Sequence, residues 1–181
     1  SKKLSTVKIN GDMYVSYGAF KNCKNLKKVI LGKNVTSIGN AMFEGCNSLQ
    51  SVSNMKNVDT IGYDAFSGTG LRTITIPSKI EEISDGAFSN CKKLSTVKGG
   101  KNVKYIEGNA FSQCVHLKSF HFSNKIQTIG RAAFSGCSSL TEVSMPKSVK
   151  SLGDNAFEKC YSLKKLKLSK GLTKIPYQCF N

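Results

Sequence analysis

Apolar residues return along the chain with a fixed period. With phenylalanine as the marker, neighbouring copies stand 23 residues apart, except for one interval of 22. The marker residues are Phe20, Phe43, Phe66, Phe88, Phe111, Phe134, Phe157 and Phe180. A period in the twenties is typical of stacked supersecondary units, none of which can bury its apolar face alone. The pattern therefore predicts a single repeat solenoid of about eight units and not several separate domains.

Each unit combines two kinds of apolar position. An aliphatic residue stands five residues before each phenylalanine: Val15, Ile38, Ile61, Ile83, Ile106, Ile129, Leu152 and Ile175. After the phenylalanine comes a Leu-x-x-Val-x-Leu pattern, as in Leu26, Val29 and Leu31, which alternates like a half-buried strand. We expect one short parallel strand per unit, joined by irregular or short helical return segments whose aliphatic, Ala, Phe and Cys positions close the core.

One unit written out in full carries a family resemblance. Residues 128–146 read Thr-Ile-Gly-Arg-Ala-Ala-Phe-Ser-Gly-Cys-Ser-Ser-Leu-Thr-Glu-Val-Ser-Met-Pro. The motif Ile-Gly-x-x-Ala-Phe-x-x-Cys-x-x-Leu resembles the repeat of the BspA-like leucine-rich-repeat family, and the match covers nearly the whole chain. The resemblance implies a leucine-rich-repeat solenoid. It also implies a cell-surface or secreted location, because the family consists largely of such proteins from host-associated bacteria and some protists, several of which look like adhesins.

Residues 1–181 are expected to form one array. The departures from the repeat are local: Thr69 replaces a cysteine in a unit that is one residue short. Asn54 and Gly99 stand at the last apolar position of the strand pattern, which predicts looser packing there and a bulge or close approach at Gly99-Gly100. Solenoids need polar caps, and neither end of the sequence shows a recognisable one, so we expect a fragment of a longer protein.

The positive charge of the chain adds polyanions to its possible partners. The net charge is +16 from 27 basic residues, of which only Arg72 and Arg131 are arginine, and no apolar run is long enough to span a membrane. Positive potential attracts polyanions, although phosphates and bases are usually recognised by the arginine fork. One lysine per unit follows the strand, in a row that we call the lysine edge: Lys33, Lys56, Lys79, Lys101, Lys125, Lys147 and Lys170. This row is either a solubilising edge or an anion-binding stripe.

The cysteines follow the repeat. Six of the seven stand three residues after phenylalanine, and Cys179 occupies an alanine position. No Cys-x-x-Cys pair occurs, so neither a metal site nor a cofactor is predicted. Stacked equivalent Cα atoms would lie about 4.8 Å apart, but their parallel Cβ vectors disfavour disulfides. We predict free, buried thiols that pack as small hydrophobic groups.

No catalytic constellation stands out. The two histidines, His116 and His121, have no repeating carboxylate or cysteine partner, and serines and tyrosines are scattered through every unit. We therefore predict no catalytic residues, no enzyme activity and no small-molecule substrate.

The outward row of the strands is the predicted binding surface, which we call the strand face. Its candidate ligand-binding residues are Lys28, Ile30, Ser53, Thr73, Thr75, Thr96, Lys98, Ser119, His121, Glu142, Ser144, Lys165 and Lys167. Solenoid curvature commonly makes such a row the binding surface, although hydroxyls at strand spacing also suit the solvated side of a sheet. The expected function is a binding or adhesion module for a host or cell-surface protein or glycan. The alternative is a binder of acidic polysaccharide or nucleic acid through the lysine edge.

Overall fold

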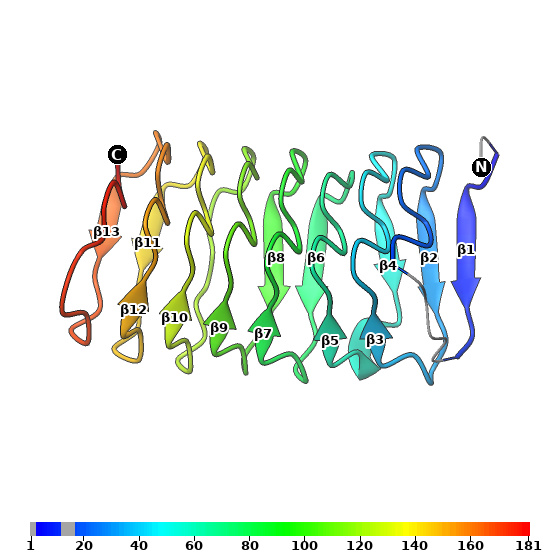
Figure 1. Ribbon diagram of the computed structural model, residues 1–181, viewed down its shortest axis with the longest axis horizontal. Helices are drawn as coiled ribbons and strands as arrows, with labels where there is room; N and C mark the ends of the chain where they lie inside the picture. Colours follow the sequence, from blue (N-terminus) through cyan, green and yellow to red (C-terminus); the bar gives the residue numbers. More distant parts are fainter. Residues whose placement is uncertain (1–2, 12–16) are drawn as a thin grey trace.

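The computed structural model of the protein describes residues 3–11 and 17–181. The chain forms a parallel β-solenoid in which each repeat unit makes one turn of the coil, and the two termini lie at opposite ends of the long axis (Figure 1). Every strand pairing in this part of the chain is parallel and joins neighbouring units. The leucine-rich-repeat solenoid predicted from the sequence is confirmed.

The main row of strands carries the Leu-x-x-Val-x-Leu pattern. Its strands are β1 (Thr6–Ile9), β2 (Lys28–Leu31), β4 (Ser51–Ser53), β6 (Thr73–Ile76), β8 (Thr96–Gly99), β11 (Glu142–Ser144) and β13 (Lys165–Lys167). Val7 pairs with Val29, which in turn pairs with Val52, so equivalent positions meet across the strands. The alternation places Val29 and Leu31 in the core and leaves the residues between them on the outside.

A second row of strands, which the sequence pattern did not predict, ends at the aliphatic position before each phenylalanine. Its members have two residues each: β3 (Ser37–Ile38), β5 (Thr60–Ile61), β7 (Glu82–Ile83), β9 (Tyr105–Ile106), β10 (Thr128–Ile129) and β12 (Ser151–Leu152). Ile129, for example, pairs with both Ile106 and Leu152. The return segments are otherwise turns, with one short 3-10 helix, η1 (Met55–Asn57). Backbone hydrogen bonds also join neighbouring units at the turns around phenylalanine, as from the Phe88 amide to the Ala110 carbonyl, so each unit is held to its neighbours on three sides of the coil.

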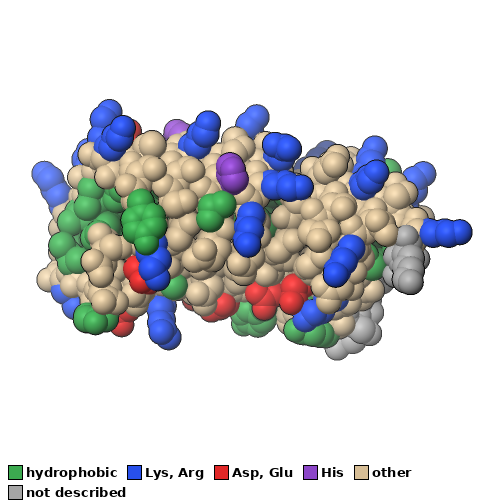
Figure 2. Space-filling model, turned by 90° about the horizontal axis from the view of Figure 1, so that it is seen from above, with side chains coloured by type: hydrophobic (Ala, Val, Ile, Leu, Met, Phe, Trp, Pro, Cys, Tyr) green, Lys and Arg blue, Asp and Glu red, His purple; other side chains and the backbone are tan. Residues whose placement is uncertain are grey.

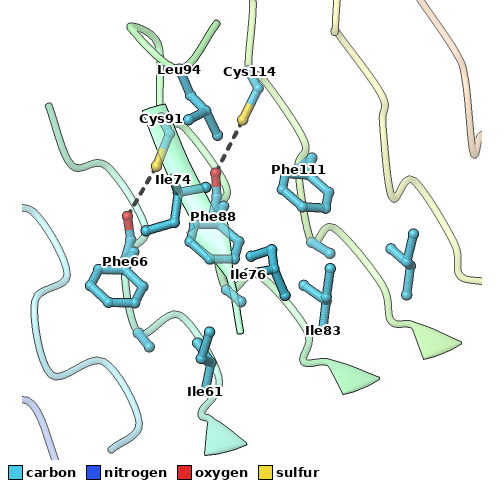
Figure 3. Packing of buried hydrophobic residues seen from close by; sticks show 14 of the residues in the cluster. Ile61, Phe66, Ile74, Ile76, Ile83, Phe88, Cys91, Leu94, Phe111 and Cys114 are labelled. Carbon is cyan, nitrogen blue, oxygen red and sulfur yellow. Dashed lines mark hydrogen bonds between the residues drawn. The ribbon is translucent and has the colours of Figure 1, made fainter. Parts of the chain in front are cut away.

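The phenylalanines form a continuous ladder through the core. Neighbouring rings in this ladder stack with centroids 5.2 to 5.7 Å apart and planes within 16° of parallel. Figure 3 shows Phe66, Phe88 and Phe111 in this arrangement, with Ile61 and Ile83 below them and Ile74 and Ile76 beside them. Offset stacking is favourable for aromatic rings, and each buried ring stabilises the fold by roughly 1.5–3 kcal/mol through the area removed from water.

The cysteines add a second ladder beside the rings. All seven are free and buried, as predicted. In five units the thiol donates a hydrogen bond of 3.0–3.4 Å to the phenylalanine carbonyl of the preceding unit, as from Cys91 to Phe66 and from Cys114 to Phe88 (Figure 3). Thr69, which replaces a cysteine, lies with its hydroxyl 3.2 Å from the sulfur of Cys91. Because the one S–H of Cys91 is given to the Phe66 carbonyl, the Thr69 hydroxyl is the donor in this contact.

Burial raises the pKa of these thiols. The pKa of Cys46, of Cys91 and of Cys179 rises from 9.0 to about 11, and desolvation is the largest cause at each. The same cause raises the pKa of Cys160 to about 12 and also raises the pKa of Cys114 and of Cys137. These six thiols are therefore protonated at neutral pH, which is the form that can donate a hydrogen bond to a carbonyl.

The turns depend on features that the sequence analysis did not identify. One or two residues after each lysine of the lysine edge, an aliphatic side chain packs into or against the core: Val35, Val58, Ile80, Val103, Ile126, Val149 and Leu172. Two positions per unit, two residues before and two after phenylalanine, adopt left-handed backbone conformations with positive φ. Glycine and asparagine suit this region, but Ala41 and Ala132 also adopt it, at φ 51° and 52°.

The strand predicted for residues 117–122 does not form, which corrects the sequence analysis. The segment has one isolated bridge, between Ser119 and Glu142, and interrupts the main row between β8 and β11. Phe120 and Phe122 stand where other units carry smaller aliphatic residues, and their rings pack against Phe134 at centroid distances of 5.0 and 5.8 Å. Two rings of this size cannot both enter the core with the backbone at strand spacing, so both remain half-buried and the pairing is lost.

The close approach predicted at Gly99 is confirmed, and Asn54 ends its strand. Gly99 has φ +79°, and a Cβ added there would overlap the carbonyl oxygen of Ile76, so the backbones approach closely. Asn54, also left-handed at φ 66°, ends its strand, leads into η1 and donates an amide hydrogen bond of 3.0 Å to the Leu31 carbonyl. The main row is accordingly divided into the sheets β1-β2-β4, β6-β8 and β11-β13.

The aliphatic positions are in the core in the middle of the array but not at its C-terminal face. Ile38 through Leu152 are buried at this position, whereas Ile175, in the last unit of the sequence, is 57% exposed. Val15 lies outside the described residues.

Phe111→Ala should destabilise the protein far more than Lys101→Ala. The first change opens a cavity between two stacked rings and should cost about 3–5 kcal/mol, whereas the second removes a solvated charge and should cost less than about 0.5 kcal/mol. Urea melts of both variants measure the difference. Equal losses would contradict the assignment of Phe111 to the core.

Stability should fall as the pH rises from about 9 to about 11. The unfolded chain loses its thiol protons near pH 9.0, while the folded state keeps those of Cys46, Cys91 and Cys179 until about 11, so their contribution is complete below pH 9 and is lost above it. Chemical melts across this range measure the slope. In a Cys46→Ala control, which is less stable at neutral pH, the decline should be shallower; an unchanged slope would mean that ionisation of this thiol contributes nothing.

Candidate binding surface

The predicted ligand-binding residues lie on one side of the coil. All are exposed except Ile30, Ser53 and Thr96, which are half-buried. Thr73 pairs in register with Thr96, and Thr75 pairs with Lys98. In the last sheet, Glu142 pairs with Lys165 and Ser144 with Lys167. The main strand row thus presents its outward side chains in lines that run from unit to unit.

The charged side chains of the strand face make no ion pairs with one another. The ion pairs of the described residues are Lys21–Glu44, Lys104–Glu81 and Lys159–Glu158, all elsewhere on the coil. Among the neutral residues, Ser53 donates a hydrogen bond of 3.4 Å to the Val29 carbonyl. The ammonium groups of Lys98 and Lys165 and the carboxylate of Glu142 therefore remain available to a ligand.

A hollow of about 330 Å³ opens on the strand face where the strand row is interrupted. Four predicted site residues line it, Ser119, His121, Glu142 and Ser144, together with the rings of Phe120 and Phe122. The same crowding that prevents a strand at residues 119–122 leaves these two rings partly exposed. Hydroxyl, imidazole and carboxylate groups around an aromatic surface can orient a ligand that has both polar groups and an apolar face.

A second hollow, of about 420 Å³, lies where the strand face meets the lysine edge. Met55, Ile76 and Pro77 line it, with Gly99 and Gly100 beside them. The repeat pattern marks Asn54 and Gly99 as unusual but does not reveal this hollow, which forms only when units two apart in the chain are brought to either side of Ile76.

The lysine edge is fully exposed. All seven of its lysines are exposed, and Lys125 donates a hydrogen bond of 2.8 Å to the Asn102 side-chain carbonyl. Asn102 and Asn57 in turn donate hydrogen bonds of 2.7 Å to backbone carbonyls of the preceding units. Figure 2 views the molecule from the other side, above the starts of the main strands, and shows that Lys and Arg side chains also line that face along its whole length, while Asp and Glu gather mostly near one margin.

Some of the carboxylates lie close enough to repel one another. Burial raises the pKa of Asp64, with smaller contributions from Glu44 and Asp85. Burial likewise raises the pKa of Glu107, again with neighbouring carboxylates contributing. The positive charge is thus concentrated on the remaining surface, including both ends of the strand face.

The described residues form no arrangement of a nucleophile and a base, and no group of three metal-binding side chains. His116 has Nδ1 at 2.6 Å from the Lys92 carbonyl oxygen, and His121 has no hydrogen-bond partner in this part of the chain. No helix among the described residues is long and apolar enough to cross a lipid bilayer. What the surface offers is therefore hydrogen-bonding, ionic and apolar contact.

Comparison with known proteins assigns the family. A family model described as BspA type leucine rich repeat region, in six copies, matches residues 13–131 and 104–181. The chain belongs to the BspA-type leucine-rich repeat family. This family is built on a repeat fold that typically serves as a non-enzymatic binding scaffold, and leucine-rich repeat proteins generally bind proteins. No curated protein sequence matches the chain significantly.

This BspA-type protein is similar to several solved structures. The leucine rich repeat protein of T. pallidum is 28% identical, with a TM-score of 0.82 over 89% of this chain and 78% of that one. The pneumococcal vaccine antigen PcpA is 18% identical, with a TM-score of 0.55 over 97% of this chain and 57% of that one. A leucine-rich repeat protein from Bacteroides ovatus is also 18% identical, with a TM-score of 0.45 over 97% and 85%.

The amides of His121 and Phe122 should exchange with solvent much faster than those of Ile74 and Val143. The first two lie where the strand row is interrupted and make no backbone hydrogen bonds in the described structure, whereas the others lie within paired strands. Hydrogen exchange followed by NMR measures the rates. Equal protection at all four positions would show that the strand row is continuous in solution.

Proposed function

We propose that the protein is a non-enzymatic binding module, displayed on a cell surface or secreted, that recognises a protein or glycan through the strand face. The observation that carries the proposal is the hollow of Ser119, His121, Glu142 and Ser144, which lies inside a row of polar side chains that make no ion pairs with one another. Membership of the BspA-type family supports both the binding role and the location.

The strand face suits specific recognition better than the lysine edge does. It combines hydroxyls, an imidazole, a carboxylate, ammonium groups and partly exposed rings, so it can distinguish ligands by shape and by hydrogen bonding as well as by charge. The lysine edge repeats one kind of group. Such a row mainly raises the association rate of anionic ligands and adds little discrimination between them.

Binding of acidic polysaccharide or nucleic acid is the second candidate. The net charge of +16 and the seven exposed lysines of the lysine edge favour it. Such binding depends on the release of counterions, so affinity would fall steeply with salt. Salt dependence therefore separates the two proposals.

The substitutions Thr75→Glu, Thr96→Glu and His121→Glu, made together, should abolish binding to a matrix or plasma protein at moderate salt. Each adds a carboxylate to the strand face without altering the core. The control Lys79→Ser with Lys125→Ser removes two charges from the lysine edge and should weaken binding only a few-fold. Surface plasmon resonance against immobilised matrix proteins, plasma proteins and heparin measures both variants.

The opposite pattern would replace the first proposal with the second. Heparin binding that falls by roughly a thousandfold between low and moderate salt, and that the control lysine substitutions remove, indicates a polyanion binder. Binding that survives the triple glutamate substitution excludes the strand face. Far-ultraviolet circular dichroism and a melt of each variant confirm that it is folded.

A further inference from the structure

The hollow at the junction of the strand face and the lysine edge has an apolar floor. Met55, Ile76 and Pro77 form this floor, with the backbone of Gly99 and Gly100 beside it. Its volume of about 420 Å³ lies near the lower end of the range for ligand pockets, roughly 300–1,000 Å³. We call it the Gly99 pocket. A volume of this order suits one large side chain and its immediate neighbours.

Two departures from the repeat create the Gly99 pocket. In other units the position of Gly99 carries a large residue, such as Leu31, Phe122 or Met145. Here no side chain fits, because a Cβ on Gly99 would overlap the Ile76 carbonyl oxygen. The Gly100 amide also donates a hydrogen bond of 3.0 Å to that oxygen, which holds the glycines against β6. The wall of the pocket on this side is therefore backbone that carries no side chain.

On the opposite side, the left-handed Asn54 ends β4 one residue earlier than β2 or β6 ends. The chain then turns into η1, which places Met55 in the floor of the pocket. Met55 is 8% exposed, so it forms a fixed part of the floor and not a loose covering. The pocket is thus bounded by three successive units.

The rim of the Gly99 pocket is cationic. Lys56 and Lys101 border it from either side, and both are exposed. Neither forms an ion pair with a described residue. Two uncompensated ammonium groups beside an apolar floor complement a ligand that carries an anion next to an apolar group. Thr75, a strand-face residue, also lines the pocket, so a ligand lying across that face reaches it directly.

We propose that the Gly99 pocket receives an apolar side chain of a protein ligand, flanked in that ligand by an acidic residue whose carboxylate lies between Lys56 and Lys101. This inference rests on the proposed function and narrows it to a protein with an acidic, apolar-anchored segment. A glycan would leave the apolar floor of Met55, Ile76 and Pro77 unfilled, and a polyanion would need only the lysines. A buried apolar anchor within a polar rim is the usual source of affinity at protein interfaces.

The test uses short peptides as probes of the pocket. Acetyl-Gly-Asp-Phe-Asp-Gly-amide is titrated into the isotope-labelled protein, and NMR follows the methyl groups of Met55 and Ile76 and the amides of Gly99 and Gly100. These signals should shift together in a saturable manner. Replacing the central Phe of the peptide by Ser should weaken binding about tenfold or more, because the apolar anchor is lost.

Charge reversal supplies a matched comparison. Lys56→Glu with Lys101→Glu should weaken binding of the Asp-Phe-Asp peptide at least about tenfold and should allow the corresponding Lys-Phe-Lys peptide to bind. The control Lys125→Glu with Lys147→Glu makes the same change in net charge elsewhere on the lysine edge. This control should leave the affinity for both peptides nearly unchanged.

The outcomes separate the pocket from the proposed function. If no peptide shifts the Met55 and Ile76 signals, or if the control variant has the same effect as the pocket variant, the pocket proposal is wrong whatever the strand face does. If the Asp-Phe-Asp peptide binds as expected but capture of protein ligands survives the triple glutamate substitution, the pocket stands and the strand-face function fails.

Discussion

The structure depends on the stacking of equivalent residues one unit apart. Each phenylalanine ring lies on the ring of the next unit, and in most units a thiol reaches back to the phenylalanine carbonyl of the unit before it. Ring stacking tolerates only a narrow separation, which is close to the spacing of paired strands. The rings and the strands therefore impose the same pitch on the coil. The rest of the unit, including the left-handed turns, fits around that pitch.

The periodic part of the fold could be predicted from the sequence because a residue that meets its own equivalents needs the same character in every unit. Phe88, Leu94 and Cys91 are examples. The second row of strands could not be predicted, because two residues are too few to show alternation. The left-handed conformation of Ala132 also left no signal, since alanine does not favour it and the neighbouring units impose it.

The candidate site was predictable only in part. Alternation placed residues such as Thr75 and Glu142 on the outside, because exposure follows from the inward position of their neighbours. The two hollows were not predictable in this way. Phe120 satisfies the apolar pattern, and only its volume reveals that the strand cannot form there. The Gly99 pocket could not be predicted because it forms between residues about 45 positions apart in the chain, namely Met55 and Gly100. Regular positions thus build the scaffold, and irregular ones create the features that a ligand can recognise.

Each unit pairs only with the units next to it. This limits how the length of such a chain can change in evolution. A duplicated or deleted stretch of one whole period would keep every ring, thiol and strand in contact with an equivalent partner, while altering the length by about 4.8 Å. A change of one residue has to be absorbed within a turn, as in the unit of 22 residues, where Phe66 and Phe88 still stack and Cys91 still donates to the Phe66 carbonyl. The length of the protein can therefore change by whole periods at little cost to folding. Related proteins would keep a shared ligand only if they retained the few irregular units, such as those around Gly99 and Phe120, in the same order.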